Sequence, residues 1–116
     1  MNGGVSVHVV DIATGRVAQG LTLSIQNLDG ECVLSGRIDE RGLLPGLETL
    51  AERFASGVYE ARLEVADFYR EAGTPLPATP FLDVLVYRFG IGDPTQHYHL
   101  PFKLTAWGVS CFRGGA

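Results

Sequence analysis

Short stretches of alternating apolar and polar residues dominate the chain, and Gly, Pro, Asp and Asn separate them at roughly regular intervals. A period of two is typical of β-strands with one buried face, and evenly spaced turn residues favour an antiparallel sandwich or barrel. The predicted strands span residues 5–10, 21–27, 32–37, 58–65, 81–89, 96–105 and 109–113. The pattern therefore predicts an all-β fold of seven or eight strands.

Three connecting segments carry further signals. Asp29-Gly30 favours the positive φ angles of a tight hairpin turn between the second and third predicted strands. Residues 67–73 resemble a short helix, with Asp67 as its N-cap and Gly73 as its stop. Residues 45–54 fit either a loop with a strand fragment or a helical turn, and the sequence leaves both open.

The composition narrows the class of protein. With 116 residues and no break in composition, the chain is predicted to form a single domain, residues 1–116. A formal charge of -4 does not suit a surface that binds nucleic acid or an anionic membrane. No apolar run approaches the roughly 20 residues of a membrane span. We expect a cytoplasmic protein with no nucleic-acid or membrane partner.

The two cysteines, Cys32 and Cys111, are far apart in the sequence. Two thiols alone make neither a disulfide framework nor a metal site. We expect them to be buried or half-buried free thiols.

Alternation also places the three histidines. Three valines share one face of the first strand, so His8 projects from the opposite face. In the strand near the C-terminus the apolar face starts at Tyr98, which leaves His97 and His99 on the other side. All three histidines are therefore predicted to avoid the core.

Imidazole exchanges protons near neutral pH, so a histidine fixed on a rigid strand is a good general base. Two other interpretations stay open. The three could be solvated surface residues, or the pair His97 and His99 could bind zinc or copper. A closed metal site would need further ligands, and the sequence shows none near His8 except Asp11. We predict no metal.

Three motifs resemble those of a known family. Residues 5–16, Val-Ser-Val-His-Val-Val-Asp-Ile-Ala-Thr-Gly-Arg, and residues 97–101, His-Tyr-His-Leu-Pro, resemble the signature stretches of the 5-hydroxyisourate hydrolases, which are enzymatic relatives of transthyretin. Residues 110–115, Ser-Cys-Phe-Arg-Gly-Gly, resemble the family's terminal Tyr-Arg-Gly-Ser motif. The resemblance implies a transthyretin-like sandwich of two four-stranded sheets with one short helix. It also implies a homotetramer, a dimer of dimers, with active sites in a channel where the dimers meet.

The reaction implied by the resemblance is hydrolysis of the six-membered-ring amide of 5-hydroxyisourate, in urate breakdown and without a cofactor. The resemblance assigns His8 and His99 to positioning and deprotonating the attacking water. It assigns Arg113 to binding the substrate's carbonyl or anionic oxygens.

The sequence departs from the family at the substrate pocket. Leu43 occupies the place of a substrate-binding arginine, and Arg41, two residues earlier, is a candidate replacement. Phe112 occupies the position where the family has tyrosine, and Gly115 the position where it has serine. Two hypotheses follow: a hydrolase for a less polar relative, such as an N-methylated hydroxyisourate, or a non-catalytic carrier of a small ligand, as transthyretin is.

Overall fold

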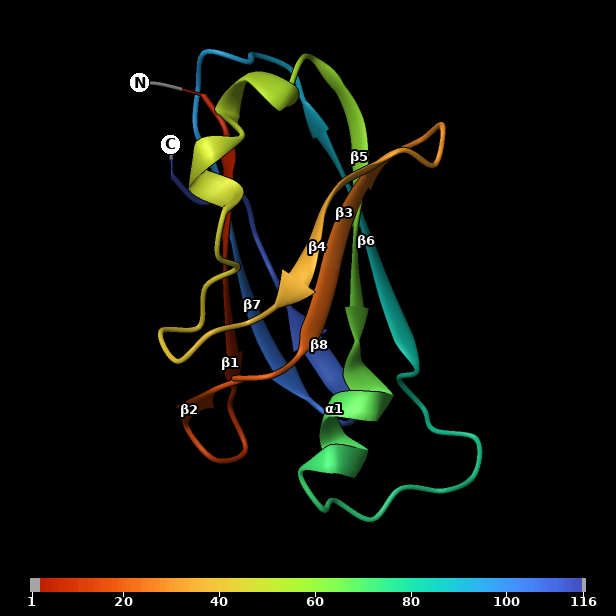
Figure 1. The fold of residues 1–116 in the computed structure, drawn as a ribbon. Coiled ribbons are helices and arrows are strands. Elements are labelled where there is room, and N and C mark those ends of the chain that lie inside the picture. The colour runs from red at the N-terminus through yellow and green to blue at the C-terminus, as the bar shows by residue number, and fades with distance from the viewer. Residues whose placement is uncertain (1–2, 116) are drawn as a thin grey trace.

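Two four-stranded sheets face each other in the computed structural model, which describes residues 3–115 (Figure 1). The first sheet has the order β2-β1-β7-β8, and the second has the order β4-β3-β5-β6. The strands are β1 Val5–Asp11, β2 Arg16–Val17, β3 Thr22–Asn27, β4 Cys32–Arg37, β5 Gly57–Glu64, β6 Val84–Ile91, β7 Tyr98–Thr105 and β8 Gly108–Ser110. The predicted all-β sandwich is confirmed.

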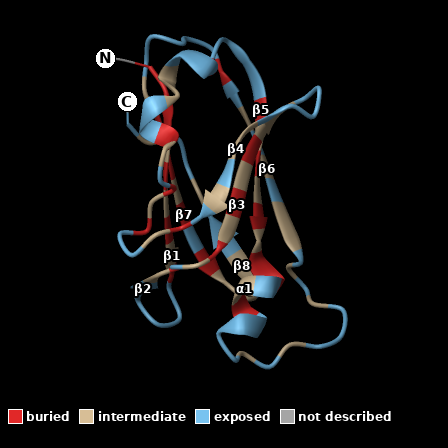
Figure 2. Ribbon diagram, in the orientation of Figure 1, coloured by how far each residue is buried: buried red, intermediate tan, exposed pale blue. Residues whose placement is uncertain are grey.

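The core lies between the two sheets, and strand alternation fills it. In β1 and β7 every second residue is buried, while the residues between them are mostly half-buried (Figure 2). β5 buries Tyr59, Ala61 and Leu63 in the same way. Removal of these apolar side chains from water stabilises the fold by about 25 cal/mol for each Å² buried. Each strand therefore keeps one face available for other chemistry.

The helix begins two residues earlier than predicted. α1 spans Val65–Glu71, and Asp67 lies in its first turn without capping it. The reason is burial: Val65, Ala66 and Tyr69 must all face the core, so the chain turns helical directly after β5. Gly73 ends the helix as predicted. Its φ of 87° and the hydrogen bonds from Gly73 N to Arg70 O and from Thr74 N to Tyr69 O form a Schellman motif.

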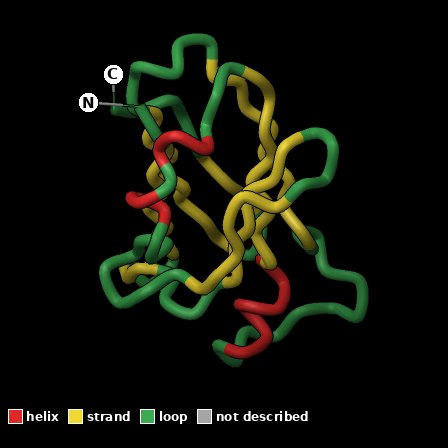
Figure 3. Tube along the Cα trace, turned by 45° about the horizontal axis from the view of Figure 1, so that its top comes forward, coloured by secondary structure: helices red, strands yellow, loops and turns green. Residues whose placement is uncertain are grey.

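Residues 45–54, for which the sequence leaves two structures possible, contain two short 3-10 helices, η1 Leu47–Thr49 and η2 Ala51–Arg53. Leu47 and Phe54 anchor it in the core. The segment lies at the end of the sandwich where the two chain ends also meet (Figures 1 and 3). It therefore borders the N-terminal part of β1.

One strand pairing contradicts the purely antiparallel prediction. β1 and β7 are parallel, with Ser6 opposite His99 and His8 opposite Pro101. A parallel pair needs a long crossover, and here the whole second sheet lies in sequence between the two strands. This pairing brings both ends of the chain to one surface.

The last strand is shorter than predicted, and Pro101 provides the reason. β8 ends at Ser110, yet Gly114 still pairs with His99 in the same antiparallel register. In that register Pro101 stands opposite Phe112, where a ladder hydrogen bond from residue 101 is due. Proline has no N–H to donate, so the ladder breaks there and resumes at Gly114.

Other strand boundaries also differ from the prediction, most of them by one or two residues. β6 begins at Val84, because the preceding residues form bends, and β7 begins at Tyr98. The pair Arg16–Val17 forms β2, which was not predicted. The predicted hairpin at Asp29-Gly30 is confirmed, with Gly30 at a φ of 85°.

Both cysteines are free thiols, as predicted. Cys111 is half-buried as predicted, but Cys32 is exposed at the start of the edge strand β4, which corrects the prediction for that residue. Among the helices of residues 3–115, none is long and apolar enough to cross a membrane.

Candidate active site

The three histidines lie on the outer face of the β1–β7 pair, as alternation predicts. His8 projects from β1, His99 from β7, and His97 immediately precedes β7. All three are half-buried. Two segments that are separated by almost the whole chain therefore form one histidine cluster, which we define as His8, His97 and His99.

Ser6 joins two of these imidazoles. Its Oγ lies 2.7 Å from Nε2 of His97 and 2.7 Å from Nδ1 of His99. On its other side, His97 Nδ1 lies 2.9 Å from the carbonyl oxygen of Gly3. The hydrogen bonds thus run in one line from the backbone of Gly3 to the ring of His99.

His8 is held from the loop after β4. Its Nε2 lies 3.1 Å from the carbonyl oxygen of Arg41, which can only accept, so this nitrogen donates. Gly42 packs against the ring: a Cβ there would come within 2.7 Å of His8 Nε2 and of Cδ2. Glycine is required at position 42 for this contact and for its φ of 83°.

The electrostatics of the cluster keep His99 neutral. Burial lowers the pKa of His99 below its ordinary value of 6.5, and the nearby charges of His8 and His97 lower this pKa further. Neutral imidazole is the form that accepts a proton. His99 Nε2 has no hydrogen-bond partner within residues 3–115, so it can accept a proton when the ring hydrogen lies on Nδ1.

The side chain of Arg113 does not contact the histidine cluster. Its guanidinium donates to Gln96 Oε1 at 2.7 Å and lies 4.2 Å from the ring centre of Tyr98. Its neighbour Gly114 forms two backbone hydrogen bonds with His99. The cation is therefore close to the cluster along the chain but directed away from it.

The other two tail residues border the cluster. Phe112 is exposed, and its ring lies 5.6 Å from Nζ of Lys103, which projects from the same side of β7 as His99. Gly115 lies against the strand itself, where an added Cβ would come 3.2 Å from the nitrogen and Cβ of His99. Since its φ is 75°, a serine at this position would be both crowded and strained.

The Arg41 side chain does not take the place of the family's substrate-binding arginine, and Leu43 lies beside the site. The Arg41 guanidinium binds the Asp39 carboxylate, at 3.0 Å from NH2 to Oδ2, and only the Arg41 backbone reaches His8. Asp39 also accepts hydrogen bonds from the backbone N–H groups of both residues. Leu43 lines a small hollow of about 90 Å³ together with Ser6, Leu44 and Leu47. The hollow is therefore lined mainly by apolar residues, with Ser6 and Glu48 as its polar ones.

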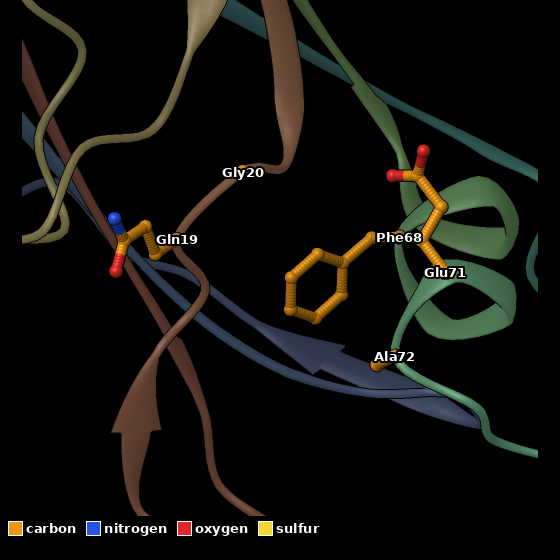
Figure 4. Close-up of a pocket in the computed structure, with 5 residues that line it drawn as sticks. All are labelled: Gln19, Gly20, Phe68, Glu71 and Ala72. Carbon is orange, nitrogen blue, oxygen red and sulfur yellow. The ribbon is translucent and has the colours of Figure 1, made fainter.

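Larger hollows lie at the other end of the sandwich. One of about 150 Å³ is lined by Gln19, Gly20, Phe68, Glu71 and Ala72, with Phe68 projecting toward the loop (Figure 4). Its neighbour of about 350 Å³ is bordered by Asp11 and Tyr69, which bind each other. No histidine lines any of these three hollows, so we place the site by its chemistry, at the histidine cluster.

No group of three histidine, cysteine or carboxylate side chains within residues 3–115 is arranged to hold a metal ion. His97 and His99 share the hydroxyl of Ser6. The arrangement is suited to proton transfer.

Ser6 is the site residue that sequence reasoning missed. It lies two residues before His8 and on the same face of β1, which is the only signal the sequence offers. Its role depends on the parallel pairing that sets it opposite His99.

Comparison with known proteins shows the family of the chain. A family model described as HIUase/Transthyretin family matches residues 5–114. The chain belongs to this family. The 5-hydroxyisourate hydrolase 2 of Rhizobium meliloti (strain 1021) is 35% identical over 116 residues, which cover 97% of each chain. The sandwich is therefore a transthyretin-like fold by sequence as well as by topology.

Two solved structures of the family are also similar. The crystal structure of an (S)-allantoin synthase matches with a TM-score of 0.86 and 27% identity, over 97% of this chain. This chain spans only 44% of the length of that protein. The 5-hydroxyisourate hydrolase of Klebsiella pneumoniae matches with a TM-score of 0.79 and 28% identity, over 96% of this chain and 98% of its own.

Proposed function

We propose that this chain is a hydrolase that opens the six-membered-ring amide of 5-hydroxyisourate in urate breakdown. The observation that carries the proposal is the free Nε2 of His99, a neutral base held beside His8 on one sheet face. The names of its relatives in Rhizobium meliloti and Klebsiella pneumoniae support the same substrate.

The reaction needs only water and the two imidazoles. His99 Nε2 takes a proton from water while the water oxygen attacks the ring carbonyl carbon. The carbonyl becomes a tetrahedral oxyanion, and the carbon–nitrogen bond of the ring then breaks. The proton on His99 passes to the departing nitrogen, which restores the neutral base. His8 borders the same reaction volume and orients the water or the substrate.

The apolar loop beside the cluster favours a less polar substrate. Leu43 faces a hollow that it shares with Ser6, and the Arg41 side chain is held by Asp39. A methyl group on the substrate gains from apolar contact here, whereas a carbonyl oxygen loses a partner. We therefore propose an N-methylated hydroxyisourate as a substrate that is turned over at least as well as the unmethylated one. Phe112 and Gly115 complete the proposed pocket, and Arg113 joins it when its guanidinium exchanges Gln96 for oxygens of the substrate.

The assembly that we propose is a homotetramer built as a dimer of dimers. Strands β6 and β8 are edge strands with backbone groups available for pairing. Apolar side chains are exposed close to these edges, at Val86, Trp107 and Val109. Burial of these side chains between subunits would remove apolar surface from water. Light scattering coupled to size-exclusion chromatography tests the assembly, and a monomeric mass contradicts it.

A spectroscopic assay tests the reaction. Freshly generated 5-hydroxyisourate and an N-methylated analogue decay slowly in buffer, and we expect the protein to accelerate both decays. Leu43→Arg should raise the rate on the unmethylated substrate relative to the methylated one, while Leu43→Met should leave the ratio unchanged. Equal decay with and without protein, for both substrates, contradicts the hydrolase.

A carrier function like that of transthyretin makes a different prediction. A carrier binds a small ligand in stoichiometric amounts and leaves hydroxyisourate decay unchanged, with or without His99. A cytoplasmic location, which the free thiols fit, also stays part of the proposal. Fractionation of cells that express the protein tests the location.

A further inference from the structure

Ser6 and His97 form a hydrogen-bonded line whose direction is fixed at one end. The carbonyl oxygen of Gly3 can only accept, so the nitrogen facing it, Nδ1 of His97, carries a hydrogen. In neutral His97 the other nitrogen, Nε2, is then a bare acceptor, and the Ser6 hydroxyl donates to it. The Ser6 oxygen is left to accept from Nδ1–H of His99.

This direction determines the tautomer of His99. With its hydrogen on Nδ1, a neutral imidazole carries its lone pair on Nε2, the nitrogen that has no hydrogen-bond partner within residues 3–115. In the opposite tautomer Nε2 carries the hydrogen and takes no proton from water. The line from Gly3 therefore selects the reactive form of the base.

We propose that Ser6 and His97 are positioning residues that hold His99 in its Nδ1-protonated tautomer and fix the orientation of its ring. The inference rests on the proposed function for its effect on hydrolysis, because His99 is the base in that reaction. The tautomer itself can be observed without any substrate.

The backbone around the line makes it rigid. Ser6 stands directly opposite His99 in the parallel β1–β7 ladder, so the ladder fixes the separation of the two residues. Tyr98 N donates to Gly4 O at 2.9 Å, which holds the segment of His97 against the start of β1. The backbone of Gly115 closes the side of His99 that faces the tail. A ring held on all these sides cannot readily turn to exchange its nitrogens.

Few charged groups surround His99. His8 faces it from β1 and His97 from its own side of β7, and both lower the pKa of His99 when they are charged. Glu48 of η1 borders the hollow beside Ser6, with its carboxylate bound to the N–H of Gly46. In the tail, the Arg113 side chain binds Gln96. Burial is the largest cause of the lowered pKa of His99, and the other two histidines lower this pKa further. Lys103 projects from the same face of β7.

The test at Ser6 compares two substitutions of the same shape. Ser6→Thr keeps the hydroxyl and adds one methyl group, whereas Ser6→Val has the same shape as threonine with a second methyl group in place of the hydroxyl. The strand accepts β-branched residues of either kind. We expect Ser6→Val to lower kcat/KM by about 10- to 100-fold, as the loss of an orienting partner does, and Ser6→Thr to retain most of the activity. Equal activity in the two variants overturns the proposal.

The acid limb of the pH profile provides a readout that a purely structural role would not move. Without the Ser6 oxygen, protonated His99 loses the acceptor for its Nδ1–H, so its pKa falls further. The limb of kcat/KM should move to lower pH in Ser6→Val while the plateau drops. A lower plateau with an unmoved limb contradicts positioning by Ser6.

The test at His97 uses two neutral replacements, so that charge is the same in both. His97→Gln offers a carbonyl oxygen to the Ser6 hydroxyl at about the reach of the imidazole, and His97→Phe offers none. We expect the Gln variant to keep more activity than the Phe variant. Equal losses would show that the line beyond Ser6 has no effect on His99.

Nitrogen-15 NMR of the imidazole rings separates this inference from the proposed function. In the unchanged protein, His99 should show a protonated Nδ1 and an unprotonated Nε2 at neutral pH, and Ser6→Val should populate the other tautomer. If this shift occurs in a protein without hydrolase activity, only the function fails. If His99 carries its hydrogen on Nε2 in the unchanged protein, or if substrate acylates the Ser6 oxygen, the positioning role fails.

Discussion

Strand β1 carries a polar cluster at each end, and the two clusters differ in one respect. At the C-terminal end, the Asp11 carboxylate accepts hydrogen bonds from Tyr69 and Thr14, each at 2.7 Å. At the N-terminal end, Ser6 joins two imidazoles at the same distance. The first cluster is closed, because both carboxylate oxygens are occupied, whereas the second ends on the free Nε2 of His99.

Burial and pKa follow this difference. Asp11 is 6% exposed and Tyr69 is 4% exposed. Burial raises the pKa of Asp11, but the hydrogen bonds from Tyr69, Thr14 and the backbone outweigh it and leave the pKa below 3.8. Burial and the bond to Asp11 raise the pKa of Tyr69. A closed, buried network ties β1 to α1, while an open, half-buried one leaves a proton acceptor for chemistry.

We expect the largest effect from a substitution that disrupts the open cluster at the N-terminal end of β1. His99→Gln removes the base and should lower kcat/KM by about 10² to 10⁴-fold, with little change in melting temperature. Arg62→Gln, on the outer face of the other sheet, serves as the control and should leave kcat/KM unchanged. Unaltered hydrolysis in the His99 variant would remove the distinction between the clusters.

We expect the next largest effect, on stability, from substitutions that disrupt the closed cluster at the C-terminal end of β1. Asp11→Ala removes a buried carboxylate with three donors, so we expect it to lower the free energy of unfolding by about 2–3 kcal/mol. Tyr69→Phe removes one donor and should cost about 1 kcal/mol. Urea unfolding measures both. Hydrolysis per folded molecule should stay unchanged, and a selective loss of activity would contradict a structural role.

The two clusters should also affect the protein in different pH ranges. The lowered pKa of His99 predicts that kcat/KM stays high to below pH 6.5 and then falls. The same lowering weakens folding as the pH falls from 6.5 toward the folded pKa, because the unfolded chain binds its proton first.

Asp11 acts at lower pH. Since its folded pKa is depressed, its contribution to stability is present above pH 3.8 and is lost as the pH falls through the folded value. Unfolding free energies of the unchanged protein and of Asp11→Asn should therefore converge only in the acid range. Convergence already near neutral pH would show that the Asp11 carboxylate does not stabilise the fold.

The smallest expected effect concerns Arg41. Its guanidinium is bound to Asp39, and only its carbonyl group contacts His8, so Arg41→Gln should change kcat/KM by about threefold at most. A loss of several powers of ten would show that Arg41 leaves Asp39 and takes the place of the arginine that Leu43 lacks. Steady-state kinetics on both substrates decides between these outcomes.

The sequence predicted much of the site, and particular residues show where it stopped. His8 and His99 were placed on outer faces because strand alternation is a local property of each segment. Ser6 was missed because its role depends on which strand pairs with β1, and in which direction. Asp67 was assigned as a helix cap from local preference, but burial of Val65 and Ala66 moved the start of the helix.

What the sequence determined by itself is most of the strands, their buried faces and the side on which each histidine lies, since a period of two needs only neighbouring residues. The tertiary structure alone decided that β1 and β7 run parallel, that Ser6 bridges His97 and His99, and that Arg113 points to Gln96. These contacts join residues from distant parts of the chain. Their geometry results from packing the whole sandwich, which no local pattern records.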